Sequence, residues 1–440
     1  MMKKIIFLLI AVIHGNLCLA EVAIDINRGV YSPIPIAIHD FRSQKPETAT
    51  LVQEVIKNDL SSSGLLHLVD PSAFVQKLQG AEDTPNFANW RLINTQFLLN
   101  GEIRSNGDRI TVVYKLYDVL SEKTVVGASL SCSYKGVRQI AHMISDSIYT
   151  YITGEGPYFN SRIVYVVEQK HRGRIIKRLA IMDSDGANHK FLTNGADIVL
   201  TPRFSPNMQE ITYFAFVDTV TPNGRIKRGV GKVFLFDLAN GKHQFVGSFS
   251  GMTFAPRFSA DGRRLIFSLS DRESSSIYET DLRSGHTRRI TRNCGAIDTS
   301  PCYSPDGDKI VFSSDRGGTQ QLYIMDADGG NIKRLSFGQG QYATPVWSPR
   351  RDWIAFTRIY KGTFYIGVMR PDGTGERMLA SGYLVEGPAW FANGRGLMFS
   401  HQSYSRGKTS IHSIDVTGHN ERILLTPHGA SDPACSPVIQ

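Results

Sequence analysis

Two short acidic runs come nearest to metal-binding chemistry in this chain. Asp183-Ser-Asp185-Gly and Asp326-Ala-Asp328-Gly resemble the opening of a calcium-binding loop. An EF-hand loop, however, needs a third acidic or amide position before its glycine and a distal glutamate. Both runs lack these residues and are interpreted as tight turns, so the sequence predicts no metal site.

The other reactive residue types form no catalytic pattern. The 12 histidines are scattered, without an H-E-x-x-H motif or paired ligand spacing. No G-x-S-x-G nucleophile elbow of a serine hydrolase is present. The first 155 residues contain no glycine-rich phosphate loop. The sequence therefore predicts no catalytic residues and no cofactor.

Cysteine chemistry is also weakly indicated. Cys132, Cys294, Cys302 and Cys435 are scattered and show no C-x-x-C spacing. Cys294 and Cys302 are close enough in sequence to form a disulfide, but two free thiols are the favoured interpretation. Cys435 is expected to be a small buried apolar residue.

A repeat in the second half of the chain indicates which elements hold these residues. A proline followed two positions later by a bulky or buried-type residue recurs at spacings of 54, 45, 44, 43 and 45 residues. A period in the forties is typical of four-stranded β-propeller blades. A plain β-sandwich is the alternative, but sandwiches carry no such period. The copies start at Pro202, Pro256, Pro301, Pro345, Pro388 and Pro433, with a degenerate copy at Pro157.

The number of copies predicts six blades. Seven copies delimit six intervals, and the last copy is followed by too few residues to build a blade. The strand expected at Arg162–Val167 follows the degenerate first copy. We expect the C-terminal segment to pair beside this strand and complete the first blade, because closure leaves only short, protected edges.

Residues 21–155 are expected to form a separate domain. Apolar residues recur at helical spacing over 51–60 and over 137–152. Ser105-Asn-Gly-Asp108 joins two strand candidates as in a β-hairpin. The predicted fold class is therefore multidomain, with an N-terminal α/β domain (a helix-backed sheet) followed by an all-β six-bladed β-propeller at residues 156–440.

Residues 1–20 are interpreted as a signal peptide. Two lysines precede nine apolar residues, and Ala20 supplies a small residue before cleavage at Glu21. The apolar run is too short to span a bilayer. A lipoprotein modified at Cys18 is the weaker alternative, because bulky Leu17 precedes that residue. The chain is therefore expected to be exported to the periplasm.

The chain is basic, with a formal net charge of +9 at pH 7. Such a balance can indicate a nucleic-acid partner, but the predicted export argues against one. The basic run at 223–228 lengthens one repeat and is expected to be an exposed hairpin tip. Attraction to anionic envelope surfaces is the functional alternative for this run.

These features together resemble the TolB family of the Tol-Pal envelope system. The resemblance covers the whole chain and rests on the signal peptide, the small α/β domain, the P-x-[FYW]-S-P-D-G units and the closing D-P-A-x-S-P motif at 432–437. Cys435 departs from the family, which has an aromatic residue there, and Met208 and Arg350 interrupt the Asp-Gly turn.

The resemblance implies a non-enzymatic, monomeric scaffold of the periplasm. Such a scaffold binds the peptidoglycan-associated lipoprotein Pal and the inner-membrane-anchored TolA. It helps to keep the outer membrane intact and to constrict it during cell division. The alternative hypothesis is a periplasmic hydrolase or lyase with its active site in the propeller channel.

The first predicted partner site is one mouth of that channel. Loops that enter the inner strands are expected to converge there and bind Pal, and the resemblance places lipoprotein contacts at Met252, Ala255 and Thr299. The alternative is that these residues only satisfy turn backbones. The predicted mouth residues are Thr201, Met252, Thr253, Ala255, Asp298, Thr299, Ser300, Thr344, Glu386 and Asp432.

The second predicted partner site is the segment after the cleavage point. Val22, Ile24 and Ile26 alternate with polar residues, so the segment can add to a sheet as an edge strand. An ordinary first strand of the α/β domain is the alternative. The resemblance implies a TolA-binding segment with contacts at Val22, Ile24, Ile26 and Val30. Pal binding would change the exposure of this segment, which couples the two sites.

Overall fold

The computed structural model describes residues 32–220, 223–247, 252–270, 274–292, 295–405 and 407–439, without the side chains of 252 and 253. Residues 32–440 form one compact unit. In these described ranges, no helix is both long and apolar enough to cross a membrane. Several predicted features lie outside the described residues: the signal peptide with Ala20 and Glu21, the segment with Val22, Ile24, Ile26 and Val30, and Cys294.

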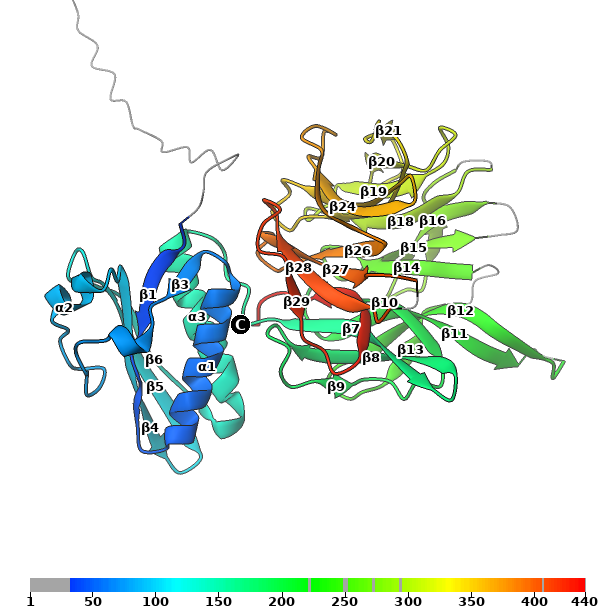
Figure 1. Ribbon diagram of the computed structural model, residues 1–440. Helices are drawn as coiled ribbons and strands as arrows, with labels where there is room; N and C mark the ends of the chain where they lie inside the picture. The colour runs from blue at the N-terminus through cyan, green and yellow to red at the C-terminus, as the bar shows by residue number, and fades with distance from the viewer. Residues whose placement is uncertain are drawn as a thin grey trace, which may run out of the picture. The chain divides into compact units, whose positions relative to one another are not determined.

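The N-terminal domain contains a mixed sheet in the order β3-β1-β4-β5-β6, with β2 paired to β4 (Figure 1). β1 runs parallel to both β3 and β4, whereas β4, β5 and β6 form an antiparallel meander. The strands are β1 (Ile34–Ile38), β2 (Arg42–Ser43), β3 (Leu66–Leu68), β4 (Phe97–Asn106), β5 (Arg109–Asp118) and β6 (Lys123–Ser133).

Two long helices, α1 (Pro46–Ser62) and α3 (Val137–Thr153), form a single apolar core with this sheet. Their apolar residues repeat every three or four positions, and Ile56, Leu60, Ile144 and Ile148 are fully buried. Burial of each such side chain stabilises the domain by about 1.5–3 kcal/mol. The short helix α2 (Phe87–Leu92) contributes Trp90 to a second, smaller cluster. The predicted helix-backed sheet is confirmed.

The rest of the chain folds into six four-stranded antiparallel sheets, which confirms the predicted six-bladed propeller (Figure 1). Five sheets are continuous in sequence, and the sixth has the order β30-β7-β8-β9. The strands are β7 (Arg162–His171), β8 (Arg174–Asp183), β9 (Lys190–Phe191), β10 (Ile198–Phe204), β11 (Glu210–Val220), β12 (Ile226–Asp237), β13 (His243–Phe245), β14 (Met252–Phe258), β15 (Arg264–Ser270), β16 (Ser275–Asp281), β17 (Thr287–Arg289), β18 (Asp298–Tyr303), β19 (Lys309–Ser314), β20 (Gln321–Asp326), β21 (Lys333–Arg334), β22 (Gln341–Trp347), β23 (Ile354–Tyr360), β24 (Thr363–Met369), β25 (Arg377–Gly382), β26 (Leu384–Trp390), β27 (Gly396–Gln402), β28 (Ser410–Asp415), β29 (Arg422–Leu424) and β30 (Gly429–Cys435).

Each blade is built around an aromatic residue of its second strand. In each blade, the bulky residue of the motif pairs with a residue of the second strand, and the aromatic residue lies two positions after that partner. The aromatic residues therefore occupy equivalent positions in all six blades. All six are buried: Tyr165, Tyr213, Phe267, Phe312, Phe356 and Phe399. The turn that precedes them is local, as at Ser304–Gly307, where the Gly307 N–H donates to the Ser304 carbonyl at 2.9 Å. Gly307 has a φ of 82°, a conformation that favours glycine.

Several contacts at the junction of the two domains are polar. The carboxylate of Asp146 on α3 accepts the backbone N–H groups of Tyr158, Phe159 and Asn160 at 2.7, 2.8 and 2.9 Å. These hydrogen bonds fix the chain where it leaves the α/β domain and approaches β7. Asp146 is buried, so its full set of acceptor contacts offsets the cost of desolvating its charge.

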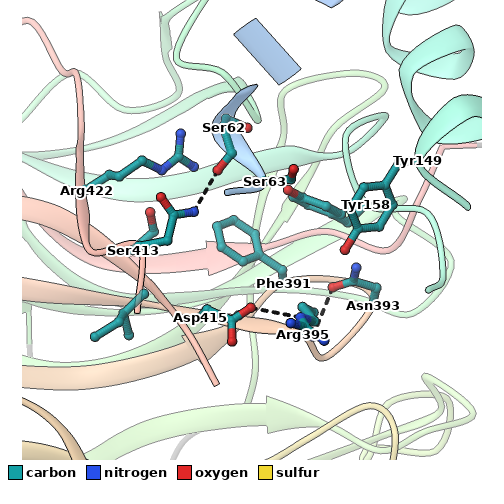
Figure 2. Close-up of a pocket in the computed structure, with 13 residues that line it drawn as sticks. Ser62, Ser63, Tyr149, Tyr158, Phe391, Asn393, Arg395, Ser413, Asp415 and Arg422 are labelled. Atoms are coloured by element: carbon teal, nitrogen blue, oxygen red, sulfur yellow. Dashed lines mark hydrogen bonds and ion pairs between the residues drawn. The ribbon is translucent and has the colours of Figure 1, made fainter. Parts of the chain in front are cut away.

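Figure 2 shows a small pocket where the domains meet, with a volume of about 30 Å³. Tyr149, Tyr158 and Phe391 line this pocket, and the ring centroids of Tyr158 and Phe391 are 5.4 Å apart. Arg395 binds Asp415 at 2.8 Å and, from the other domain, Glu155 at 3.0 Å. The pocket has room for little more than water, so the contact is closely packed rather than a ligand site.

A second polar contact joins α1 and α3 to the turn after β8. His142 Nδ1 and Asp59 Oδ2 lie 2.8 Å apart and are almost fully buried. Arg138 binds Asp183 at 3.4 Å and also pairs with Asp185. Within the described residues, the ligand atoms of Asp59, His142 and Asp185 alone form a potential metal-binding group. Each of these side chains already has a protein partner.

We predict that His142 makes stability depend on pH. Burial lowers the pKa of His142, but the hydrogen bond and charge of Asp59, together with Asp185 and Asp183, outweigh burial and raise it above 6.5. A raised pKa in the folded state means that the ionised ring stabilises the fold below the unfolded pKa. That contribution is lost as pH rises through the folded pKa.

Urea unfolding between pH 6 and pH 9 measures this effect. The wild type is expected to lose more free energy of unfolding over this range than His142→Gln. Parallel pH profiles for the two proteins would contradict the assignment.

Candidate partner-binding channel

The residue before each motif proline adopts a left-handed backbone conformation. At each of these positions the pairing of the first and second strands shifts register, so all six blades carry a β-bulge at the same level. Proline has no N–H to give to a strand ladder, and a bulge is a place where a sheet tolerates it. The φ angles are 48° at Thr201, 52° at Ala255, 53° at Ser300, 47° at Thr344, 65° at Gly387 and 51° at Asp432.

These six residues form what we term the pre-proline ring. The backbone N–H groups of three of them connect neighbouring blades. The Ser300 N–H donates to Ser268 Oγ at 3.1 Å, and the Asp432 N–H donates to Ser400 Oγ at 3.0 Å. The Gly387 N–H donates to Thr357 Oγ1 at 3.3 Å. Each acceptor lies on the second strand of the preceding blade, so adjacent blades hold one another's bulges in place.

The pre-proline ring surrounds a cavity of about 320 Å³. Apolar side chains line part of it, among them Leu200, Phe214, Phe216 and Phe254. Five of the predicted mouth residues meet here: Thr201, Ala255, Ser300, Thr344 and Asp432. Their predicted position on loops is wrong. They lie inside β10, β14, β18, β22 and β30, because the bulge accommodates the following proline within the strand.

The other predicted mouth residues lie elsewhere. Asp298 is fully buried, and its two carboxylate oxygens accept hydrogen bonds from Arg316 Nη2 at 2.9 and 3.0 Å. Thr299 Oγ1 accepts a hydrogen bond from Gln320 at 3.5 Å. Met252 and Thr253 open β14, and their side chains are outside the described set. Neither Asp298 nor Thr299 lines the cavity.

Glu386 is an exposed residue next to the ring. Desolvation by the surrounding atoms raises the pKa of Glu386, and the like charge of Asp432 raises it further. Burial also raises the pKa of Asp432, although Arg203 and Lys177 oppose that shift. The acidic groups of this mouth therefore influence one another.

Sequence reasoning missed two arginines in the channel. Arg203 and Arg257 follow the motif prolines of two adjacent blades and line both the ring cavity and the cavity beyond it. Pro-Arg-Phe occurs in only two of the copies. This difference between the repeats is the sequence signal that distinguishes Arg203 and Arg257. Burial and the like charge of Arg257 lower the pKa of Arg203 to about 9.

The bulky residues of the motif surround the other end of the channel. They line a second cavity of about 420 Å³ together with the serine-proline turns. Cys435 takes the place of an aromatic residue here. Burial raises its pKa to about 11, so the thiol is protonated at neutral pH. Cys132, Cys302 and Cys435 are free thiols.

The ring cavity contains the chemistry of a binding surface. Its lining combines phenylalanine rings, hydroxyl groups, two guanidinium groups and the carboxylate of Asp432. Among the described residues that line it there is no histidine or cysteine, and no hydroxyl paired with a general base. Such a set can position a ligand or a partner surface, but it lacks an activated nucleophile.

Fold and channel together define a class: a two-domain protein in which an α/β domain precedes a six-bladed propeller with a central channel. The TolB beta propeller domain family matches residues 149–439, and the TolB amino-terminal domain family matches residues 22–125. The chain belongs to the TolB family. Family membership makes it a non-enzymatic protein, so the hydrolase or lyase hypothesis is not retained.

Individual relatives agree with this assignment. The chain is 44% identical over 422 residues to the Tol-Pal system protein TolB of Gluconobacter oxydans, covering 95% of this chain and 89% of that one. It is 43% identical over 454 residues to the protein of the same name from Rickettsia rickettsii, covering all of both chains. The crystal structure of TolB from Acinetobacter baumannii matches with a TM-score of 0.79 at 25% identity, covering 92% of this chain and 97% of that one.

We predict that position 255 prefers glycine over a branched residue. Left-handed φ costs an ordinary residue about 1–2 kcal/mol and is worst for a β-branched side chain. Ala255→Val is expected to lower the free energy of unfolding by about 1–2 kcal/mol. Ala255→Gly should leave it unchanged or raise it by up to about 1 kcal/mol.

Ala343 is a matched control, because it lies one residue before Thr344 in β22 and has no left-handed φ. At Ala343, glycine should be the destabilising substitution and valine the tolerated one. Urea unfolding of the four variants tests this contrast. The same order of stability at both positions would contradict the assigned strain.

Proposed function

We propose that this protein is a non-enzymatic periplasmic scaffold of the Tol-Pal system. In this proposal it binds the lipoprotein Pal at the pre-proline ring and binds TolA through its N-terminal segment. Linking these two partners would contribute to outer-membrane integrity and to its invagination during division. The observation that carries the proposal is that six bulged strands place mixed apolar and polar side chains around one rigid cavity.

Rigidity of the ring favours a role in protein recognition. Ser300 and Asp432 are held by hydrogen bonds to the neighbouring blade, so little conformational entropy is lost when a partner binds. Phe216 and Phe254 offer partly exposed apolar area within the same cavity. Apolar area surrounded by hydroxyl and charged groups is typical of protein interfaces.

The N-terminal part of the proposal rests on the sequence and on the family. We propose cleavage after Ala20, which would leave a mature chain starting at Glu21 with functional domains at 21–155 and 156–440. Val22, Ile24, Ile26 and Val30 would then contact TolA by strand addition. Neither a nucleic acid nor a second copy of the chain is part of this proposal.

Charged substitutions in the channel mouth are predicted to weaken Pal binding. Ala255→Arg would place a bulky cation in the ring cavity, and Thr299→Arg would place one directly before the ring residue Ser300, where the family resemblance predicts a Pal contact. We expect the dissociation constant to rise at least tenfold, about 1.4 kcal/mol, with the melting temperature changed by only a few degrees. Calorimetry with the purified periplasmic domain of Pal measures the effect.

Ile423→Arg is the control, because Ile423 is 59% exposed on the outer strand β29. It should bind Pal as the wild type does. Wild-type affinity in both channel variants would exclude this mouth as the Pal site.

Deletion of residues 22–33 is predicted to abolish TolA binding. The segment precedes β1, so its loss should leave the sheet and the propeller folded. Pull-down with TolA and calorimetry with Pal should show loss of the first interaction and retention of the second. If the truncated protein still binds TolA with wild-type affinity, the segment is only structural and the coupling idea fails.

A further inference from the structure

Arg203 and Arg257 differ from their counterparts in the other blades. Both occupy the position directly after the motif proline, where the side chain faces the channel. We call them the channel arginines. The other four blades place small, uncharged side chains at this position: Cys302, Val346, Ala389 and Ala434. Two positive charges therefore stand beside open space on adjacent blades.

The channel arginines have no acidic partner. Arg203 Nη1 donates to the carbonyl of its neighbour Pro202 at 2.6 Å. Neither arginine forms an ion pair with an aspartate or glutamate of the described residues. Two other shielded arginines do form ion pairs, Arg316 with Asp298 and Arg395 with Asp415. A shielded, unpaired guanidinium group is costly, and two of the same sign increase that cost.

The surroundings of the channel arginines suit a small anion. They line the ring cavity of about 320 Å³ on one side and the cavity of about 420 Å³ on the other. Phe214, Phe216 and Phe254 line the first of these and lower the local dielectric constant, which strengthens electrostatic attraction. A guanidinium fork matches the oxygen spacing of carboxylates and phosphates.

Asp432 is the acidic group that acts on Arg203. Arg203 and the backbone of Thr201 both lower the pKa of its carboxylate, but Asp432 and Arg203 form no ion pair in the described structure. Among the charged side chains that line the ring cavity, Asp432 is one carboxylate against two guanidinium groups, and Glu386 lies next to the ring without lining the cavity. The negative charge of Asp432 should therefore weaken the binding of an anion, but it does not neutralise both arginines.

We propose that Arg203 and Arg257 together bind a small oxyanion of the sulfate, phosphate or carboxylate type inside the channel. The same chemistry could come from a free anion or from an acidic side chain of a protein bound at the mouth. The site does not depend on the proposed function, because free sulfate is a sufficient probe.

Sulfate titration of the full-length mature protein at constant ionic strength tests the proposal. Calorimetry and thermal unfolding should show saturable binding with one site per molecule. Arg203→Gln and Arg257→Gln should each weaken that binding at least tenfold. Asp432→Asn keeps the shape of the side chain and removes its charge, so it should strengthen binding severalfold. Arg172→Gln/Arg174→Gln removes two exposed charges of the β7–β8 hairpin and should change nothing.

Two further measurements complete the test. If the arginine variants fold poorly, a crystal of the wild type grown with selenate shows by anomalous scattering whether the anion lies between the two guanidinium groups. If sulfate does not bind, the partner's carboxylate is tested by Pal binding. In that case Arg257→Gln should weaken Pal binding and reduce its salt dependence. Absence of both effects, or selenate only outside the channel, would overturn the proposal.

Discussion

Pairing of β30 with β7 is the contact on which the propeller depends. Residues 429–435 lie beside residues 163–168, so the last strand of the chain completes the blade begun by the first strand of the propeller. Hydrogen bonds continue beyond the ladder: the Ser436 N–H donates to the Arg162 carbonyl at 2.8 Å, and Asn160 Nδ2 donates to the Ile439 carbonyl at 2.7 Å. Without β30, the backbone groups of β7 on that side would have no partner, and β26 would lose the strand that packs against it.

Closure also connects the propeller channel to the α/β domain. The strand β30 carries Asp432 into the pre-proline ring. At its other end it brings Ile439 to Asn160, whose backbone N–H is held by Asp146 of α3. Channel and α/β domain are thus linked through the same few hydrogen bonds, although their sequences lie far apart.

Much of the fold could be predicted because its signals are local. The Ser304–Gly307 turn closes through residues three apart, and the apolar faces of α1 and α3 repeat at the helical period. The pre-proline ring could not be predicted in this way. A residue before proline favours an extended backbone, so left-handed Thr201 and Thr344 are imposed by the paired second strand and the adjacent blade.

The same reasoning explains what was missed in the channel. A bulge inserts one residue and exchanges the two faces of a strand. Without the bulge, the direction of Arg203 cannot be inferred from alternation alone. Asp298 was predicted at the mouth, but its burial depends on Arg316, which lies 18 residues further along the chain. Asp183 and Asp185 form a turn as expected, yet their partner Arg138 comes from the other domain.

The residue directly after each motif proline can differ between blades because the fold does not require a particular side chain there. The conformation before each proline is fixed by the bulge, and the aromatic residue of each second strand fills the blade core. The side chain directly after the proline does neither, so it is arginine in two blades and cysteine, valine or alanine in the others. If all six blades carried the same side chains, every side of the channel would be equivalent. Asp432, Arg203 and Arg257 come from three consecutive blades, whereas Ser300, Thr344 and Gly387 of the opposite blades carry no charge. The uneven distribution of charge around the channel therefore comes from residues that the blade architecture does not fix.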